Sequence, residues 1–161
     1  MEKDYDWAEE KKVNMPYIIE VVLEKNAEIS SFLNKMIRDF NNEHSIHHRK
    51  VRREGSKQPI NIIVMDEDKK WVGGITAEVY WEWLEINKFW FDEKYRGKGL
   101  GGLLLEETER IAIDKGAKKA LLTTYEFQAR SFYEKKGYEV VGEVKDYPPG
   151  SSYYTLVKSL I

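Results

Sequence analysis

The chain has 161 residues, of which 42% are hydrophobic and 34% are charged, and its formal net charge is −2. These values are typical of one globular domain, with no overall attraction to nucleic acid or to a membrane surface. The absence of cysteine excludes disulfides, thiolate metal sites and a cysteine nucleophile. The sequence shows neither an apolar run of membrane-spanning length nor a signal peptide, so we expect a cytoplasmic protein.

The first third of the chain predicts a short tail, a strand and a helix. Residues 1–14 are highly charged and predict a loosely held leader, so a single domain is expected over residues 15–161. The apolar run Tyr17–Lys25 predicts a first strand. Residues 26–44 predict a helix capped by Asn26, and the polar, basic residues 45–59 predict a loop or a short irregular helix.

The remaining chain alternates between hairpins and helices. Residues 60–80 predict two strands around a turn at Asp66–Lys70, and residues 81–91 predict a third strand rich in aromatic residues. A helix at 99–115, a strand at 117–126, a short helix at 128–137 and a closing hairpin over 138–160 follow. Strands joined both by hairpins and by helices predict an α/β fold with a mixed sheet packed against helices.

The segment "YRGKGLGGLLLEE", from Tyr95 to Glu107, starts an apolar helix in an unusual way. Soluble helices commonly open on Ser, Thr, Asp or Asn, whose side-chain oxygen accepts a backbone N–H of the first turn. This helix opens on glycines with Arg96 and Lys98 among them. Cations beside the positive end of a helix are unfavourable unless an anion joins them, which indicates a bound anion such as phosphate.

Other interpretations of this turn fit less well. Gly97, Gly99 and Gly102 match the G-x-G-x-x-G dinucleotide fingerprint, but that motif normally follows the first strand of a doubly wound sheet. Here it follows a run of strands that look antiparallel, and the remaining chain is too short for such a sheet. A phosphate-binding loop of the Walker type would end in Gly-Lys-Ser/Thr, which is absent. Close helix packing would explain one or two glycines but not Arg96 and Lys98.

Two stretches carry a resemblance to a known family. "FWFDEKYRGKGLGGLLLEE" resembles the acyl-coenzyme A site of the GNAT superfamily, the Gcn5-related N-acetyltransferases, and Arg96–Gly101 matches its [Gln/Arg]-x-x-Gly-x-[Gly/Ala] signature. "QARSFYEKKGYEVVGE" resembles the second common stretch of that family. The resemblance extends over about Tyr17 to Ile161. It implies the GNAT fold, a central, mostly antiparallel sheet with helices on both faces.

The resemblance implies acetyl transfer from acetyl-CoA to a primary amine, directly and without a covalent enzyme intermediate. The pantetheine arm would pair with the strand before the turn, and the pyrophosphate would bind the turn itself. The residues implied are Phe89, Trp90 and Phe91 for the arm, and Arg96, Gly97, Lys98, Gly99, Leu100, Gly101 and Gly102 for the pyrophosphate. Many members hold the cofactor with an Asn where this chain has Glu126, and Gln128 is the candidate substitute.

The reaction needs a base for the amine and an acid for the departing thiolate. An alkyl ammonium has a pKa of roughly 10.4, so a base would help to deprotonate it near neutral pH. Glu85 stands at about the position where some family members place a glutamate base, and Glu82 is the alternate candidate. Glu85 could equally be an ordinary solvent-exposed glutamate of a strand. The resemblance implies that Tyr133 is the general acid, whereas its pattern alone also suits a core tyrosine.

Other features leave further functions open. His44, His47 and His48 have spacings that a helical metal site uses, but we expect a solvated segment and no metal. The basic stretch "HHRKVRRE" keeps a nucleic-acid adaptor as a third hypothesis, after an enzyme and a catalytically silent acyl-CoA-binding domain. We expect a small amine acceptor as partner and neither nucleic acid nor membrane. A homodimer is left open.

Overall fold

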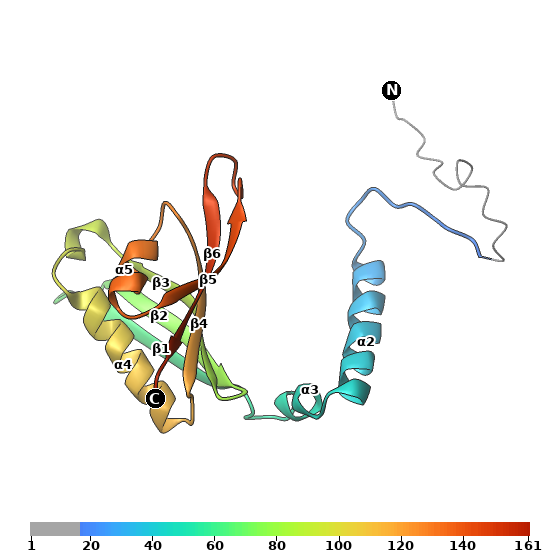
Figure 1. The fold of residues 1–161 in the computed structure, drawn as a ribbon, viewed down its shortest axis with the longest axis horizontal. Coiled ribbons are helices and arrows are strands. Elements are labelled where there is room, and N and C mark those ends of the chain that lie inside the picture. The colour runs from blue at the N-terminus through green and yellow to red at the C-terminus, as the bar shows by residue number, and fades with distance from the viewer. Residues whose placement is uncertain (1–16) are drawn as a thin grey trace. The chain divides into compact units, whose positions relative to one another are not determined.

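A six-stranded sheet organises residues 46–161 in the computed structural model, with the strand order β1-β2-β3-β4-β6-β5 (Figure 1). β3 and β4 are parallel and the other neighbouring pairs are antiparallel. The predicted α/β fold with a mixed, mostly antiparallel sheet is therefore confirmed. The strands are β1 (Gln58–Met65), β2 (Trp71–Tyr80), β3 (Trp83–Phe91), β4 (Lys119–Tyr125), β5 (Glu139–Lys145) and β6 (Ser152–Ser159). The helices of this part are α3 (Ile46–Val51), the short 3-10 helix η1 (Glu93–Tyr95), α4 (Leu100–Asp114) and α5 (Arg130–Lys135).

The structure describes residues 17–161, and the chain divides between Ser45 and Ile46 into two compact units. The leader predicted over residues 1–14 lies outside the described residues, and the single domain expected over residues 15–161 stays a prediction. In the described part of the chain, no helix combines the length and the apolar character needed to span a membrane.

The helix predicted after residue 25 is α2 (Ala27–His44). Asn26 caps it as expected, because its side chain accepts a hydrogen bond of 2.9 Å from the backbone N–H of Ile29. The strand predicted over Tyr17–Lys25 is wrong: these residues form no strand, and Ile18 and Leu23 are exposed. Apolar residues favour an extended backbone, but a strand needs a neighbour that supplies hydrogen bonds, and composition does not reveal that neighbour.

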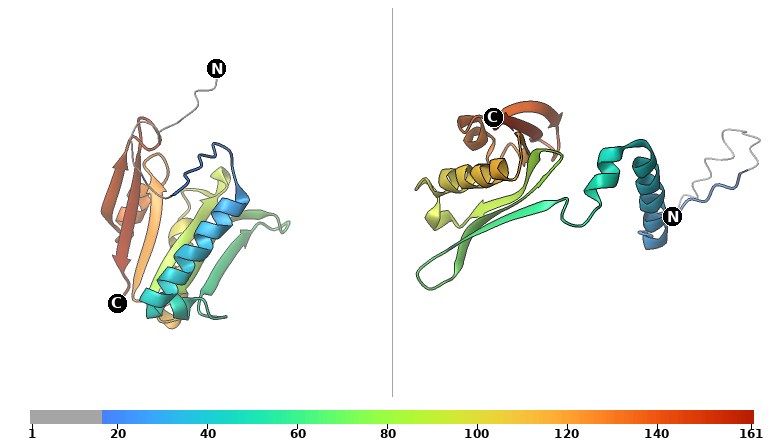
Figure 2. Two further views of the ribbon diagram at one scale, coloured as in Figure 1. Left: turned by 90° about the vertical axis from the view of Figure 1, so that its right-hand side faces the viewer. Right: turned by 90° about the horizontal axis from the view of Figure 1, so that it is seen from below.

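The core of the 46–161 unit lies where α4 packs across β1, β2 and β3 (Figure 2). Successive strand side chains point to opposite faces of a sheet, so alternate residues of each strand face the helix. These residues are apolar and almost fully buried, and α4 meets them with its own leucines. They include Ile75, Ala77 and Val79 of β2, Leu84 and Ile86 of β3, and Leu104 and Leu105 of α4.

The opposite face of β2 and β3 carries polar and aromatic side chains. Glu78 lies directly across from Glu85, and Tyr80 lies across from Trp83. All four side chains are only partly buried. The same two strands therefore contribute an apolar face to the core and a chemically rich face outside it.

A buried polar network ties α4 to the strands at the other end of the sheet. Glu109 of α4 accepts hydrogen bonds from the Tyr138 hydroxyl at 3.0 Å and from Lys158 Nζ of β6 at 2.7 Å. Glu109 is itself buried. Burial and the neighbouring carboxylate raise the pKa of Tyr138, so its hydroxyl stays a donor at neutral pH.

Replacing Glu109 by alanine should destabilise the fold, because it leaves Lys158 and Tyr138 without their shared acceptor. We expect Glu109→Ala to lower the free energy of unfolding by about 3 kcal/mol, the scale for breaking a buried ion pair. Urea denaturation followed by circular dichroism measures this. Glu107→Ala is the matched control, because Glu107 lies on the same helix and its ion pair with Arg110 is exposed. Equal losses in the two variants would contradict a role for the buried network.

Candidate active site

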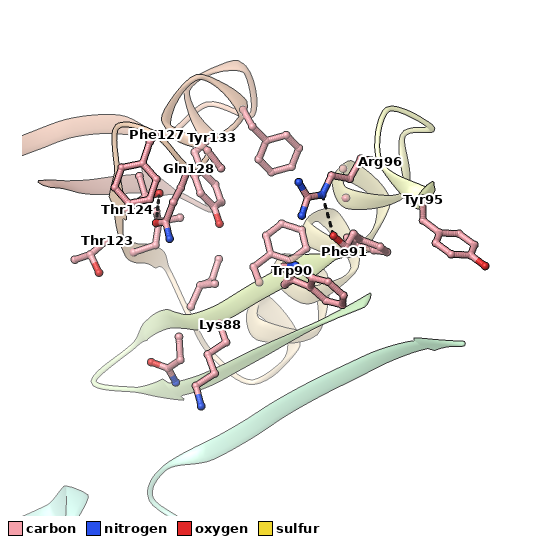
Figure 3. A pocket seen from close by; sticks show the side chains of 18 of the residues that line it. Lys88, Trp90, Phe91, Tyr95, Arg96, Thr123, Thr124, Phe127, Gln128 and Tyr133 are labelled. Atoms are coloured by element: carbon pink, nitrogen blue, oxygen red, sulfur yellow. Dashed lines mark hydrogen bonds between the residues drawn. The ribbon is translucent and has the colours of Figure 1, made fainter. Parts of the chain in front are cut away.

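β3 and β4 part after three residue pairs, and a cleft opens between them. Their parallel pairing joins residues 83–85 to residues 119–121 and ends there. Beyond this point a cavity of about 940 Å³ lies between residues 86–91 on one side and residues 122–124 on the other. Figure 3 shows Trp90 and Arg96 on one side of it and Thr123, Thr124 and Tyr133 on the other. β3, the strand that leads into the glycine turn, thus separates from β4 along the cleft.

A β-bulge at Asn87 marks the place where β3 leaves β4. Ala77 of β2 pairs with Ile86 and the preceding residue, Thr76, pairs with Lys88, so Asn87 has no residue opposite. An extra residue of this kind bends its strand and increases the local twist. β3 thus stays paired with β2 while its backbone on the β4 side borders the cleft.

The three aromatic residues predicted to contact the pantetheine arm all line the cleft. Phe91 is buried, whereas Trp90 is more than half exposed. The Phe91 ring lies over Gly73 on the neighbouring strand, where a Cβ atom would clash with it. Glycine at position 73 is therefore what lets the ring lie flat on the sheet beside the cleft.

The glycine turn lies at one end of the cleft and leads into α4. Gly97 and Gly99 have φ angles of 72° and 80°, and no atom lies within 4 Å of the point where a Cβ would stand. Positive φ suits glycine, and the open space lets a ligand approach the backbone N–H groups closely. Five residues of the turn line the cleft, namely Arg96, Gly97, Gly99, Gly101 and Gly102.

The first turn of α4 has the electrostatics of an anion site. Gly99 provides no side-chain cap, and no acidic residue stands in the first turn. The helix dipole places partial positive charge at this point, and the guanidinium of Arg96 adds a full charge. Arg96 Nε donates a hydrogen bond of 2.9 Å to the carbonyl of Phe91, which holds the guanidinium beside the cleft (Figure 3). A phosphate fits this combination of free donors and positive charge.

Two predicted residues of the turn do not line the cleft. The Lys98 ammonium lies 5.5 Å from the centre of the Tyr95 ring. Leu100 packs its side chain against the core. A contact of either residue with a ligand would therefore have to come from its backbone N–H group or from a movement of the side chain.

Gln128 lines the opposite wall, as predicted for a residue that holds the cofactor. Its Oε1 accepts a hydrogen bond of 3.2 Å from the Thr124 hydroxyl and one of 3.1 Å from the backbone N–H of Tyr125. These bonds fix the side chain at the end of β4 and leave its amide nitrogen toward the cavity (Figure 3). Gln128 thus offers an amide donor to the cleft, two residues after Glu126.

Tyr133 of α5 lines the cleft although only 6% of it is exposed. Its ring packs against Phe89, Phe132 and Tyr138, with centroids 5.3–6.4 Å apart. Burial raises the pKa of Tyr133 to about 12, so the phenol keeps its proton throughout the neutral range. Tyr133 is thus packed in the core and also exposes its hydroxyl to the cavity (Figure 3).

Glu85 lies at the apex of the cleft, because its pair with Leu121 is the last before β3 and β4 part. It does not itself line the cavity, which begins with the next residue, Ile86. The hydroxyl of Tyr80 donates a hydrogen bond to Glu85 Oε2. The alternate base, Glu82, lies in the exposed β2–β3 turn and forms an ion pair of 2.7 Å with Lys118.

No cluster of three His, Asp or Glu side chains suited to a metal ion occurs among residues 17–161. His44 stacks on Phe40. In α3, the His47 carbonyl accepts a hydrogen bond of 3.2 Å from Trp81 Nε1, and the His48 ring meets Trp81 edge-on. The basic segment that contains α3 therefore supports the β2–β3 turn.

Several lining residues were not predicted from the sequence: Asn87, Lys88, Tyr95, Thr123, Thr124 and Phe127. Asn87 and Lys88 reach the cleft through the bulge, and a bulge depends on the pairing register. Thr123 and Thr124 line it because β4 no longer pairs with β3 there, although it stays paired with β6. Phe127 directly precedes Gln128, and this adjacency to a predicted residue is the one feature of the sequence that could have placed Phe127 at the cleft.

The sequence is similar to several acetyltransferases. It is 38% identical over 89 residues to the blasticidin-S acetyltransferase of Streptomyces morookaense, an alignment that covers 55% of this chain and 65% of that protein, just under two thirds of its length. It is 28% identical over 105 residues to an acetyltransferase of Agrobacterium fabrum, covering 65% of this chain and 77% of that protein.

The fold is similar as well. The crystal structure of an acetyltransferase from Bacillus cereus superimposes with a TM-score of 0.74 at 31% identity, over 87% of this chain and 97% of that one. The model of the acetyltransferase (GNAT) family matches residues 29–138, more than half of the chain. With this match, a splayed strand pair and an uncapped glycine turn in one cleft, the chain belongs to the GNAT family of acetyltransferases.

Proposed function

We propose that this protein transfers an acetyl group from acetyl-CoA directly to a primary amine of a small molecule. The observation that carries the proposal is the cleft itself. It has an uncapped helix start beside Arg96 at one end, a protonated tyrosine in its wall and a glutamate at its apex. These are the three functions that acetyl transfer to an amine requires.

The cofactor would extend along the cleft from the glycine turn toward the apex. Acetyl-CoA supplies an activated acyl group as a thioester. The backbone N–H groups of residues 97–102 and the Arg96 guanidinium would hold its pyrophosphate. The backbone of Phe89, Trp90 and Phe91 would pair with the pantetheine amides, since this edge of β3 has lost β4 as its partner. Gln128 would donate from the opposite wall.

The proton transfers would be divided between Glu85 and Tyr133. Glu85 takes one proton from the acceptor ammonium, directly or through a water molecule, and frees the nitrogen lone pair to form the new C–N bond. Tyr133 donates its phenolic proton to the sulfur as the C–S bond breaks. The nitrogen would give up its second proton, directly or through water, to the Tyr133 phenolate once the C–S bond has broken. Glu85 would release its proton to solvent. Both groups then return to their starting states, and the products are the amide, the free thiol and one proton.

A cluster of aromatic rings beside the cleft supports a small-molecule acceptor. Tyr125 and Phe127 stack with centroids 5.3 Å apart, and Tyr153 and Tyr147 of the β5–β6 hairpin adjoin them. Phe127 also lines the cleft, so the cluster is continuous with the cofactor site. The similarity to an enzyme named for blasticidin S agrees with a small-molecule acceptor. We propose that the hairpin and Phe127 wall the acceptor pocket.

A panel of amines, assayed by detection of the released thiol, tests the proposed activity. Small primary amines should be acetylated at rates well above the hydrolysis of acetyl-CoA alone. Calorimetric binding of acetyl-CoA without turnover of any amine would instead support the silent acyl-CoA-binding domain. The absence of both binding and turnover would contradict the assignment of the cleft.

Gly99→Ala should weaken coenzyme A binding about tenfold, because a methyl group would stand where the phosphate approaches the backbone. Isothermal titration calorimetry measures this. Gly55→Ala is the matched control, since Gly55 has a φ of 75° with equally open space but does not line the cleft. Both variants should lose roughly 1 kcal/mol of stability from the strained backbone. Equal affinities in the two variants would count against phosphate binding at the turn.

Tyr133→Phe should lower kcat about 100-fold, the scale of general acid catalysis, with little change in the KM for acetyl-CoA. A donor must be protonated, and a pKa raised to about 12 keeps Tyr133 protonated below that pH. The loss should therefore be the same at every pH from roughly 6 to 10, where the phenol stays protonated. A variant with full kcat at neutral pH would remove Tyr133 from the mechanism.

Glu85→Gln should abolish the fall of kcat/KM on the acid side of the pH profile, because an amide has no proton-accepting form. It should also lower the rate at neutral pH by about 100-fold. Glu82→Gln, measured in parallel, should retain both the rate and the acid limb. The reverse pattern would move the base to Glu82.

A further inference from the structure

We propose that Tyr80 is a positioning residue for acetyl transfer, which holds the carboxylate of Glu85 at the apex of the cleft. This inference rests on the base function proposed for Glu85. Tyr80 stands apart from the family's acyl-CoA motifs, and it does not line the cleft. Its importance comes from the sheet, which brings it next to Glu85.

The pairing of β2 with β3 makes the two residues diagonal neighbours on one face. Tyr80 pairs with Trp83, and Glu78 pairs with Glu85. Tyr80 and Glu85 therefore lie diagonally across the two strands, two residue pairs apart along the ladder. Diagonal neighbours lie within reach of long and aromatic side chains. The Tyr80 hydroxyl spans this distance and donates its hydrogen bond to Glu85 Oε2.

Tyr80 is a constant donor because it keeps its proton. Burial, the hydrogen bond to Glu85 and the charges of Glu85 and Glu78 raise the pKa of Tyr80 to about 12. Two cations face the same group of side chains. Lys57 lies 3.5 Å from Glu78 and 4.7 Å from the centre of the Tyr80 ring, and Lys119 of β4 lies over the Trp83 ring.

The turn that follows Tyr80 is held in a strained conformation. Trp81 and Glu82 have φ angles of 52° and 62°, a region that residues with a Cβ atom rarely occupy. Trp81 is anchored by its hydrogen bond to the His47 carbonyl of α3, and Glu82 by its ion pair with Lys118. Strain of this kind persists only where the surroundings impose it. The anchors thus fix the end of the hairpin and, with it, the direction of Tyr80.

The hydrogen bond assigns the two oxygens of Glu85 different tasks. Oε2 is held by Tyr80, which leaves Oε1 to receive the proton of the acceptor. Glu78 lies directly opposite and, as a like charge, would disfavour the ionised carboxylate. The donor from Tyr80 offsets this repulsion, because a hydrogen bond to a charged carboxylate stabilises it.

The test compares the wild type with Tyr80→Phe, and with Tyr154→Phe as a matched control that removes a hydroxyl from another tyrosine of the sheet. Each full-length protein carries isotope-labelled glutamate carboxyl carbons, and Glu85→Gln identifies the Glu85 signal by NMR. In Tyr80→Phe, the Glu85 carboxylate should bind its proton about tenfold more tightly. In Tyr154→Phe, the Glu85 signal should titrate as it does in the wild type.

Kinetics with the best amine of the panel add a second measurement. In Tyr80→Phe, the acid limb of kcat/KM should move to higher pH by about one unit, and kcat should fall more than KM rises. An unchanged Glu85 titration in Tyr80→Phe overturns this inference alone. If instead Glu85→Gln keeps the acid limb, the proposed base is lost, and the catalytic role of Tyr80 with it.

Discussion

The site depends on one constraint, the early end of the pairing between β3 and β4. A parallel ladder that continued past Glu85 would satisfy the backbone of β3 and leave no space between the strands. Because the ladder stops after three pairs, residues 86–91 present an unpartnered backbone edge to a cavity inside the sheet. Such an edge would be costly in a buried place, and it is suited to a ligand that carries amide groups. The same interruption puts Glu85 at the apex and Gln128 at the open end.

The start of α4 also shapes the site, because it follows the end of β3, the strand that borders the cleft. The chain leaves β3, makes the turn of η1 and enters α4 through glycines, so the helix N-terminus and the cleft belong to one continuous segment. Arg96 connects the two physically, through its hydrogen bond to the carbonyl of Phe91. The core leucines of α4 then fix the direction of the helix, and the buried Glu109 ties the helix to β6. Packing contacts far from the cavity thereby determine where the positive N-terminal end of α4 lies.

The two faces of β2 and β3 carry different kinds of side chain: one face packs in the core, and the other carries the groups proposed to take part in the reaction. The face against α4 is apolar and nearly closed to solvent. The other face carries Glu78, Tyr80 and Glu85, which form hydrogen bonds and ion pairs with each other and with Lys57. Strand alternation accounts for this division, because successive side chains of a strand point to opposite faces of the sheet. The β2–β3 turn gains its rigidity from α3, which gives the basic segment before β1 a structural role.

Local patterns in the sequence were sufficient for the helices, the closing hairpin and the glycine turn, since caps, glycines and periodicity act over a few residues. The second motif also pointed to Tyr133 and Gln128, which both line the cleft. The sequence did not reveal that Tyr17–Lys25 forms no strand, that Lys98 points to Tyr95, or that Tyr80 bonds to Glu85. Each of these is decided by a partner distant in the chain: a neighbouring strand, a ring or a carboxylate. Sequence alone determined the predicted elements and the residues proposed to carry the chemistry. Only the tertiary structure decided which of these residues meet, because pairing register and the bulge at Asn87 are properties of the assembled sheet.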